Sequence, residues 1–375
     1  MSTKFNISEY ASQKLDISRA VAALMVLIGH FRGSYFMSFN ELEENSKNIF
    51  NFILFAFTRI GHQCVIVFFV LSGFLVGGIS ISKVASGYFS GFEYLSKRLT
   101  RMYVVLIPAL IFGGILDYTY ILKNMNLDVS LKTFIGNVFF MQTILVPVYG
   151  SNGPLWSLAY EFWYYIMFLI VILCYLRLKN NICKYIVIIG CLILFSILVP
   201  KIMILFPIWL LGCVIPLVPK YSILKKNYLY VFWMLFLAPF ILFCNYFESI
   251  FTDYLLGLYF CVLIVLWLNR KKKVNKNLYY FKIIADFSFT MYAIHSPVIT
   301  FFENYCNQMF PSQRLTTANL YNWLGLILFV FLICIISYLI YFLTEKNTSK
   351  VRGYVVKKLI FNSVVHKFNK NYYRF

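Results

Sequence analysis

The sequence has very little charge for its length. Only 13% of its 375 residues are charged, whereas 61% are hydrophobic and 20% are aromatic. A water-soluble domain of this size cannot expose so much apolar surface without aggregating. The composition therefore excludes a soluble protein and predicts one whose solvent is lipid.

Long polar stretches, internal repeats and paired cysteines are also missing. The longest polar stretches are about 30 residues, so we expect no soluble domain. The nine cysteines lie mostly in or beside apolar runs, with no Cys-x-x-Cys pair, which favours buried apolar side chains over a metal or redox site. The absence of a repeat disfavours a transporter built from duplicated halves.

Apolar runs of membrane-spanning length are abundant. A spanning helix needs roughly 20 apolar residues, because it crosses ~30 Å of hydrocarbon and must satisfy its backbone polar groups internally. The candidate runs are 17–37, 60–80, 102–118, 134–149, 155–176, 182–200, 202–218, 229–247, 252–269, 283–302 and 321–343. They predict an all-α transmembrane helix bundle. The first run is full length and lacks a clear small-residue cleavage site, so we expect a spanning helix there rather than a signal peptide.

The distribution of basic residues decides between ten and eleven crossings. If the short run 134–149 is re-entrant or interfacial, one side of the membrane receives 27 of the 34 Lys and Arg residues. The other side keeps only Arg32, Lys47, Arg59, Lys123, Lys132, Lys201 and Arg314. Cytoplasmic loops retain Lys and Arg, so the sequence predicts about ten spanning helices with both termini cytoplasmic.

The net charge of +20 follows from this asymmetry. Basic loops facing an anionic cytoplasmic leaflet explain it, and we expect no nucleic-acid partner. We divide the chain into a transmembrane domain, 1–345, and a basic cytoplasmic tail, 346–375. The tail alternates basic and aromatic residues, which suits a segment lying on membrane lipid or a disordered tail.

Two ionisable residues in the first run form one candidate site. Arg19 stands near its cytoplasmic edge and His30 follows eleven residues later. Eleven residues are close to three helical turns, so the two side chains share one helix face about 16 Å apart. Arg19 alone could be an arginine that extends its charge to the membrane surface and sets the orientation of the helix. His30, by contrast, is a natural proton acceptor.

Three later segments also place polar groups in or at the membrane. Glu161 lies within a spanning run and needs a partner or a proton. Arg98 and Arg101 are three residues apart and so lie on one helix face. There they could either fix the orientation of the helix in the membrane or bind phosphate. His295 is two residues before Pro297, a residue that frees a backbone carbonyl and kinks a helix.

Taken together and in order, these segments resemble the membrane acyltransferase family 3. The resemblance covers about residues 15–345 and is carried by LDISRAVAALMVLIGH, FFVLSGFLV, KRLTRMYVVLIP, PLWSLAYEFWYYI and FSFTMYAIHSPVI. One departure is Ile17-Ser18, where the family commonly has Gly-Leu or a similar small pair. We expect no soluble hydrolase-like domain after the helices.

The resemblance implies transfer of an acyl group, most often acetyl from acetyl-coenzyme A, to a glycan hydroxyl beyond a bacterial cytoplasmic membrane. The acceptor would be lipid-linked or a surface polysaccharide such as O-antigen, capsule or exopolysaccharide, a step that rests on analogy. By the same resemblance acetyl-coenzyme A would be the donor, and no metal is expected. The alternative is a transporter of a glycan or acylated intermediate without chemistry.

The resemblance also implies roles for individual residues. Arg98 and Arg101 would hold the coenzyme phosphates, and His30 would be the general base or carry a transient acyl group. Glu161 would orient the His30 imidazole or contact the acceptor, and Arg19 would hold the donor or stabilise the oxyanion. The expected cavity-lining residues are Ser72, Trp156, Ser157, Tyr292 and His295.

Overall fold

The computed structural model describes residues 7–121, 127–178, 181–218, 224, 226–270, 272–309 and 314–358. Within these residues the regular secondary structure is helical, with two isolated β-bridges, Phe36 to Leu315 and Gln142 to Val146. The α-helices are α1 (Glu9–Tyr35), α2 (Ile49–Thr58), α3 (Gly61–Ser72), α4 (Ile79–Ala85), α5 (Gly91–Ile121), α6 (Leu131–Val138), α7 (Leu155–Arg177), α8 (Asn181–Leu198), α9 (Pro200–Val214), α10 (Asn227–Leu235), α11 (Leu237–Tyr246), α12 (Ile250–Leu268), α13 (Tyr279–Met309) and α14 (Leu320–Leu343). The prediction of an all-helical chain is confirmed.

Short helical turns complete the architecture. A π-helical turn, η3 (Gly73–Gly78), joins α3 to α4 without a break. The 3₁₀ turns are η1 (Phe39–Glu41), η2 (Glu44–Ser46), η4 (Ile215–Leu217), η6 (Lys276–Leu278) and η7 (Glu345–Asn347). The helix continues after η7 over residues 348–358. The predicted tail therefore begins as a helix, and residues 359–375 lie outside the described residues.

Seven helical stretches in the described part of the chain are long and apolar enough to cross a membrane. They are Ile49–Ala85, Gly91–Thr119, Leu155–Arg177, Pro200–Leu217, Asn227–Tyr246, Ile250–Leu268 and Leu320–Lys358. The other predicted runs, 17–37, 182–200 and 283–302, coincide with α1, α8 and α13. These three helices are not among the seven stretches for two reasons. The apolar part of α8 is too short, and polar residues lower the mean hydropathy of α1 and α13.

The ambiguous run 134–149 does not form a spanning helix. It contains only the end of the eight-residue α6, and eight residues rise about 12 Å, far less than the hydrocarbon thickness. The segment then turns back through residues 139–154 to the start of α7. Gln142 donates to the carbonyl of Leu155 (3.0 Å) and Asn152 donates to that of Ala293 (2.7 Å), which ties the segment to the bundle.

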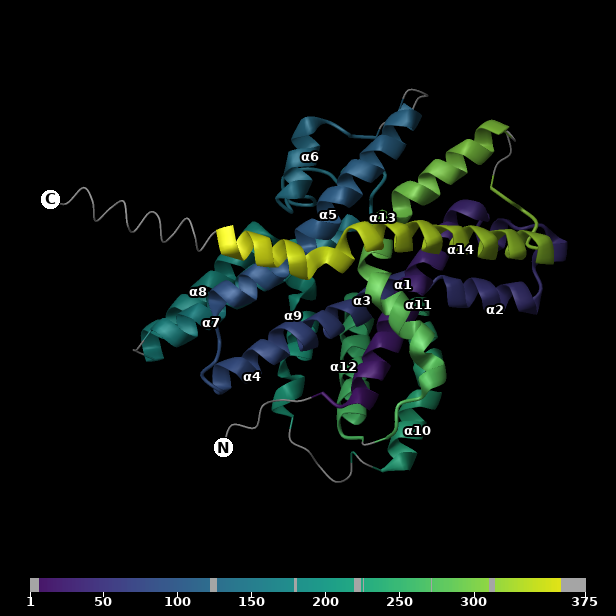
Figure 1. Cartoon of the computed structure of the whole chain (residues 1–375). Helices are drawn as coiled ribbons and strands as arrows, with labels where there is room; N and C mark the ends of the chain where they lie inside the picture. The colour runs from purple at the N-terminus through teal and green to yellow at the C-terminus, as the bar shows by residue number, and fades with distance from the viewer. Residues whose placement is uncertain are drawn as a thin grey trace.

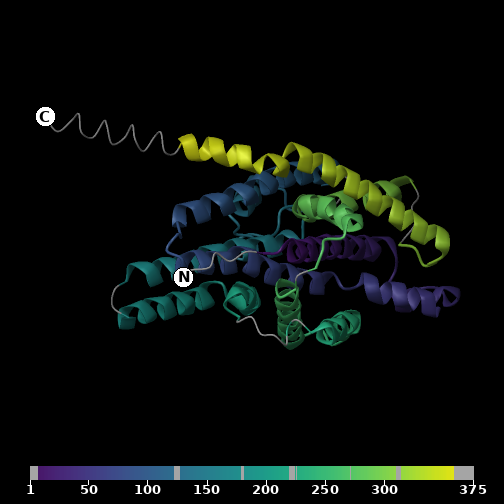
Figure 2. The same ribbon diagram turned by 60° about the horizontal axis from the view of Figure 1, so that its bottom comes forward.

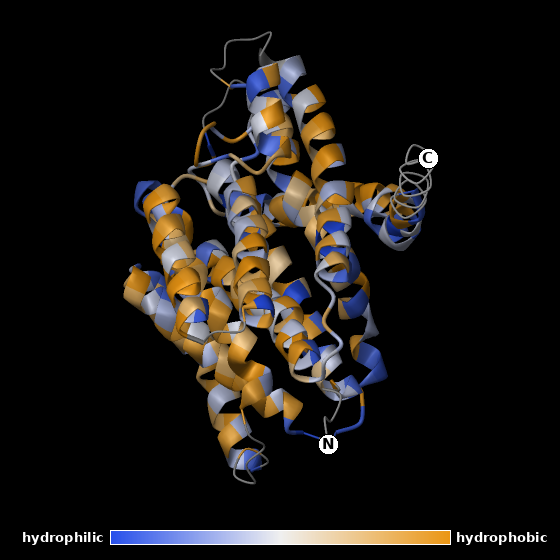
Figure 3. Ribbon diagram, turned by 90° about the vertical axis from the view of Figure 1, so that its left-hand side faces the viewer, coloured by the Kyte–Doolittle hydropathy of each residue, from blue (hydrophilic) through white to orange (hydrophobic). Residues whose placement is uncertain are grey.

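The helices pack around α1 and α3, with the more apolar helices outside. Figure 1 shows α1 among its neighbours and α14 crossing the bundle over α5 and α13. In the turned view of Figure 2, α14 lies along one outer edge of the bundle. The outer helices are largely hydrophobic (Figure 3), and many large apolar side chains of α8, α10 and α14 are exposed. An apolar outer surface suits lipid as the solvent.

Glycines let α3 and η3 approach α9 closely. A Cβ on Gly73 would lie 1.9 Å from the backbone oxygen of Trp209, and one on Gly212 would lie 2.2 Å from that of Val70. Backbone cannot move aside as a flexible side chain can, so only glycine fits at both positions. This contact places Trp209 against Ser72 at the junction of α3 and η3, a π-turn of the kind often found at functional sites.

Candidate active site

Helices α1 and α13 carry two polar contacts along one shared interface. Near the start of α1, Arg19 Nη2 donates to the carbonyl of Ala285 (3.1 Å). Three turns later, His30 Nδ1 lies 2.7 Å from His295 Nε2. Both α1 side chains therefore face α13, as the spacing of eleven residues predicts. The rise of the helix separates them by about 16 Å.

The hydrogen bonds around His295 determine where the ring protons are in the neutral pair. His295 Nδ1 faces the backbone oxygens of Tyr292 (2.8 Å) and Met291 (3.2 Å). A carbonyl oxygen only accepts, so Nδ1 carries the proton. Nε2 of His295 must then accept from the Nδ1–H group of His30. This pattern leaves a lone pair on Nε2 of His30, the nitrogen that can take a proton.

The two histidines differ in exposure. Residue His295 is 1% exposed, whereas His30 is an exposed residue. Their rings stack with centroids 5.0 Å apart and an interplanar angle of 14°. His295 is therefore a fixed, buried partner, and His30 is the exposed member of the pair.

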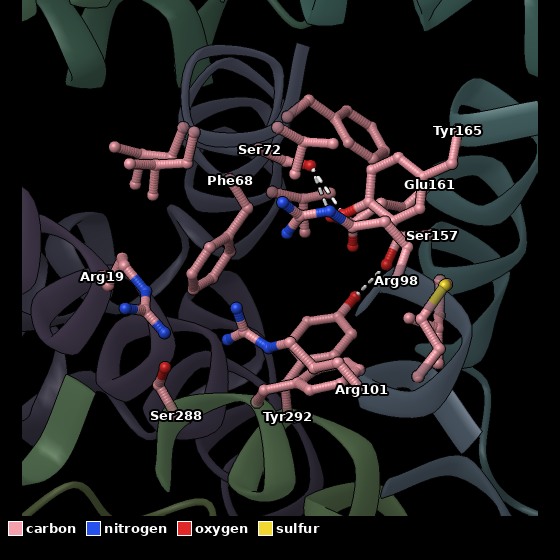
Figure 4. Close-up of a pocket in the computed structure, with 18 residues that line it drawn as sticks. Arg19, Phe68, Ser72, Arg98, Arg101, Ser157, Glu161, Tyr165, Ser288 and Tyr292 are labelled. Atoms are coloured by element: carbon pink, nitrogen blue, oxygen red, sulfur yellow. Dashed lines mark hydrogen bonds between the residues drawn. The ribbon is translucent and has the colours of Figure 1, made fainter. Parts of the chain in front are cut away.

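A cavity of about 140 Å³ opens among α1, α3, α5, α7 and α13. The close-up in Figure 4 shows Arg19, Arg98 and Arg101 pointing toward its interior; Arg98 lies on the same side as Ser72 and Glu161, and Arg19 and Arg101 lie across from them. Its lining also includes Phe68, Phe69, Met102, Ser157, Tyr165, Ser288, Phe289 and Tyr292. Segments from distant parts of the chain thus meet at one space.

The arginines have few protein partners. Arg98 Nε is buried and makes no hydrogen bond to any described residue. Arg101 lies 3.6 Å from Glu345 and 5.7 Å from the centre of the Phe289 ring. Arg19 lies 3.7 Å from Asp16. A buried donor without an acceptor is costly, so the orphan Nε of Arg98 fits a cavity that takes an anionic ligand.

Glu161 belongs to a hydrogen-bond network on the cavity wall. Its carboxylate accepts from the hydroxyl of Ser72 (2.5 Å) and from that of Tyr165. Trp209 Nε1 donates to Ser72 Oγ (3.1 Å). These contacts fix the carboxylate within the helix bundle, and no hydrogen bond between Glu161 and His30 is present. The orienting contact to His30 comes from His295.

Tyr292 links the cavity to the histidine pair. Its hydroxyl lies 2.6 Å from Ser157 Oγ and donates to the carbonyl of Pro154 (3.1 Å). The Tyr292 ring lines the cavity and lies 5.6 Å, centroid to centroid, from the His295 ring. The cavity and the histidine pair are thus adjacent sites along α13, and the two histidines do not line the cavity.

The structure brings together most of the residues that the sequence singles out. Seven line the cavity, namely Arg19, Ser72, Arg98, Arg101, Ser157, Glu161 and Tyr292. His30 and His295 form the adjacent pair. Trp156 lies outside the cavity lining and packs edge-on against Phe69 and Tyr160.

Sequence reasoning missed two partners. Tyr165 lies one turn after Glu161, so the i, i+4 spacing could have identified it as the partner of the buried carboxylate. Glu345 reaches Arg101 and Thr290 from beyond the last long apolar run. Only the packing of α14 across α13 brings it there, and no local pattern in the sequence indicates it.

Comparison with known proteins gives the family. A family model described as an acyltransferase domain matches residues 12–342. The chain belongs to the acyltransferase 3 family. The family model covers every helix that contributes to the cavity and to the histidine pair.

Two curated relatives match part of the chain. One is named O-acetyl transferase, from Shigella phage Sf6, and is 32% identical over 169 residues, 42% of this chain and 45% of the relative. The other, an uncharacterized protein of Haemophilus influenzae strain Rd, is 30% identical over 127 residues, 30% of this chain and 51% of the relative. The chain thus spans about half the length of each relative. No solved structure matches it.

Proposed function

We propose that this protein transfers an acetyl group from acetyl-coenzyme A to a hydroxyl of a bacterial surface glycan such as O-antigen, capsule or exopolysaccharide. Family membership supports acyl transfer, and the name of the phage relative supports acetyl as the acyl group. The observation that carries the proposal is the histidine pair, which leaves Nε2 of His30 as an accessible base beside an arginine-lined cavity.

The cavity is the donor end of the site. Arg98, Arg101 and Arg19 present guanidinium groups, which match phosphate oxygens in charge and geometry. Arg19 lies about 16 Å along α1 from His30, so we assign it to donor binding rather than to the oxyanion at the reacting carbonyl. The extended arm of the coenzyme then carries the thioester along α13 toward His30.

His30 is the general base in this proposal. Its Nε2 takes the proton of the acceptor hydroxyl while the hydroxyl oxygen attacks the thioester carbonyl, and the coenzyme thiolate leaves. His295 holds the His30 ring and accepts from its Nδ1–H group. A histidine base typically contributes 10²–10⁴-fold to the rate. Glu161, fixed by Ser72 and Tyr165, shapes the donor cavity.

The orientation in the membrane completes the proposal. About ten helices cross a bacterial cytoplasmic membrane, with both termini, and the tail that starts at residue 346, in the cytoplasm. The arginine-lined cavity then faces the compartment that supplies acetyl-coenzyme A, and His30 lies toward the side where the glycan is exposed. Twenty-seven of 34 Lys and Arg residues on one side support this orientation.

The test is acetyl transfer in membranes that contain the protein. Membranes are incubated with radiolabelled acetyl-coenzyme A, and label is counted in the extracted glycan. We expect covalent label with the unaltered protein and almost none with His30→Ala at an equal protein level. Transport of the glycan without label would contradict the proposal. Mass analysis of the surface glycan, with and without the protein, identifies the acyl group and the sugar position.

A further inference from the structure

Three arginines gather at the end of the bundle where His30 is exposed. Arg32 follows His30 by two residues on α1. A Cβ on Gly29 would lie 2.6 Å from the carbonyl oxygen of Thr58, so the end of α2, and with it Arg59, packs directly beside the His30 turn. We call the surface formed by Arg32, Arg59 and Arg314 the arginine mouth.

Arg314 is brought to the arginine mouth by backbone pairing. The neighbouring Leu315 donates from its N–H group to the carbonyl of Tyr35 (3.0 Å), and its own carbonyl accepts from Met37 (3.0 Å). This bridge fixes the segment before α14 against the end of α1. Arg59 and Arg314 are the charged groups that act on Arg32 at this end.

The three arginines of the mouth differ in the negative charge around them: Glu41 acts on Arg314 and Glu248 lies near Arg59, both at the outer edge of the mouth. Arg32 makes no ion pair with any described residue, its Nε is buried without a hydrogen-bond partner, and its guanidinium lies 5.1 Å from the centre of the Phe55 ring. Arg59 reaches Glu248 only at 3.9 Å, with both side chains more than half exposed. Such an exposed pair contributes little.

This concentration of charge is unusual for this part of the chain. By the charge count only seven of the 34 basic residues belong to this side, and three of those seven form the arginine mouth. Topology does not require them here, because translocated segments are normally poor in Lys and Arg. Like charges held together repel, and a bound anion would relieve both the repulsion and the orphan Nε of Arg32.

We propose that the arginine mouth binds an anionic group of the acceptor, a phosphate or a carboxylate, and so places the acceptor hydroxyl at His30. The inference rests on the proposed function, because it identifies the second substrate as an anion. Guanidinium forks bind both groups bidentately. A phosphate would come from a lipid-linked acceptor, and a carboxylate would come from an acidic sugar.

Equilibrium binding tests the arginine mouth without relying on catalysis. The full chain is purified with Arg19→Gln, Arg98→Gln and Arg101→Gln, which removes the donor arginines, and is titrated with labelled inorganic pyrophosphate and, separately, labelled glucuronate. We expect saturable binding of one of them, pyrophosphate for a phosphate and glucuronate for a carboxylate. Adding Arg32→Gln should weaken this binding about ten-fold, the loss of one charged contact.

Matched variants separate binding from folding. Arg314→Gln, in the segment before α14, should also weaken binding, and Arg32→Lys should weaken it less than Arg32→Gln because it keeps the charge. Lys201→Gln removes an exposed basic residue from the start of α9 and should change nothing. Absence of saturable binding to either anion, or binding that Arg32→Gln and Arg314→Gln leave unchanged, would overturn the inference. Failure of the proposed function shows instead in the acetyl-transfer assay, as absence of label in the glycan.

Discussion

His30 and His295 are hydrogen-bonded across the interface of α1 and α13, with 2.7 Å between Nδ1 of the first and Nε2 of the second. The backbone oxygens of Tyr292 and Met291 fix the proton of His295 on Nδ1, so the pair has one neutral arrangement. Most orienting partners of a catalytic histidine are carboxylates. A neutral imidazole gives orientation without adding a negative charge inside the membrane.

This pairing makes His295 a positioning residue, and its loss should slow the chemical step. His295→Ala should lower kcat about 10–100-fold and leave the KM for acetyl-coenzyme A nearly unchanged, because the donor arginines are untouched. His295→Gln keeps an acceptor for the Nδ1–H group of His30 and should recover part of the activity. Steady-state kinetics in detergent measure both values.

A structural role alone would give a different pattern. If His295 only fills space, His295→Gln and His295→Ala should lower the amount of folded protein in parallel, with unchanged kcat for each folded molecule. Size-exclusion chromatography of the detergent-solubilised variants measures the folded fraction. An unaltered kcat in His295→Ala would reject the positioning role.

The donor arginines should affect binding of acetyl-coenzyme A. Arg98→Gln should raise the KM for the donor at least about ten-fold, since a charged hydrogen bond to phosphate is lost. Arg101→Gln should have a smaller effect, because Arg101 is already shared with Glu345. The comparison variant is Arg177→Gln, at the exposed end of α7, which should leave the KM unchanged. If Arg98→Gln instead reduces the amount of protein inserted in the membrane and leaves the KM normal, Arg98 serves to orient the helix in the membrane and does not bind the donor.

Membrane orientation can be tested with alkaline phosphatase, which is active only outside the cytoplasm, where its disulfides form. Inserted in the 3₁₀ segment before α2, after Asn45, it should be active. Inserted between α12 and α13, after Val274, it should be inactive. An eleventh crossing at 134–149 would reverse the second result but not the first, so the pair of insertions decides between the two topologies.

Local spacing predicted much of the candidate site. The eleven residues from Arg19 to His30 set both side chains toward one neighbouring helix, and the three residues from Arg98 to Arg101 set both toward one cavity. Such relations depend only on helix periodicity. The arrangement of the motifs in one space followed from family resemblance.

Relations that depend on helix packing were not predictable. His30 and His295 are separated by 265 residues, and nothing in either segment shows that their rings meet. The break between α10 and α11 at Phe236, by contrast, has a local signal, because Pro239 cannot donate a helical hydrogen bond to residue 235. The spans were harder to count because α1 and α13 carry the polar residues of the site. The features that make these helices functional lower their hydropathy.

The contact between α3 and α9 gives a stability prediction. Gly73→Ala or Gly212→Ala would place a methyl group within 1.9 or 2.2 Å of backbone oxygen, so the helices must separate, at a cost of about 1–3 kcal/mol or more. Each variant should melt at lower temperature in detergent and lose acetyl transfer, because Trp209 would leave Ser72. Gly190→Ala in α8, where a Cβ meets nothing within 4 Å, should be neutral or slightly stabilising. Equal melting temperatures for Gly73→Ala and Gly190→Ala would show that the close approach of α3 and α9 does not hold the site together.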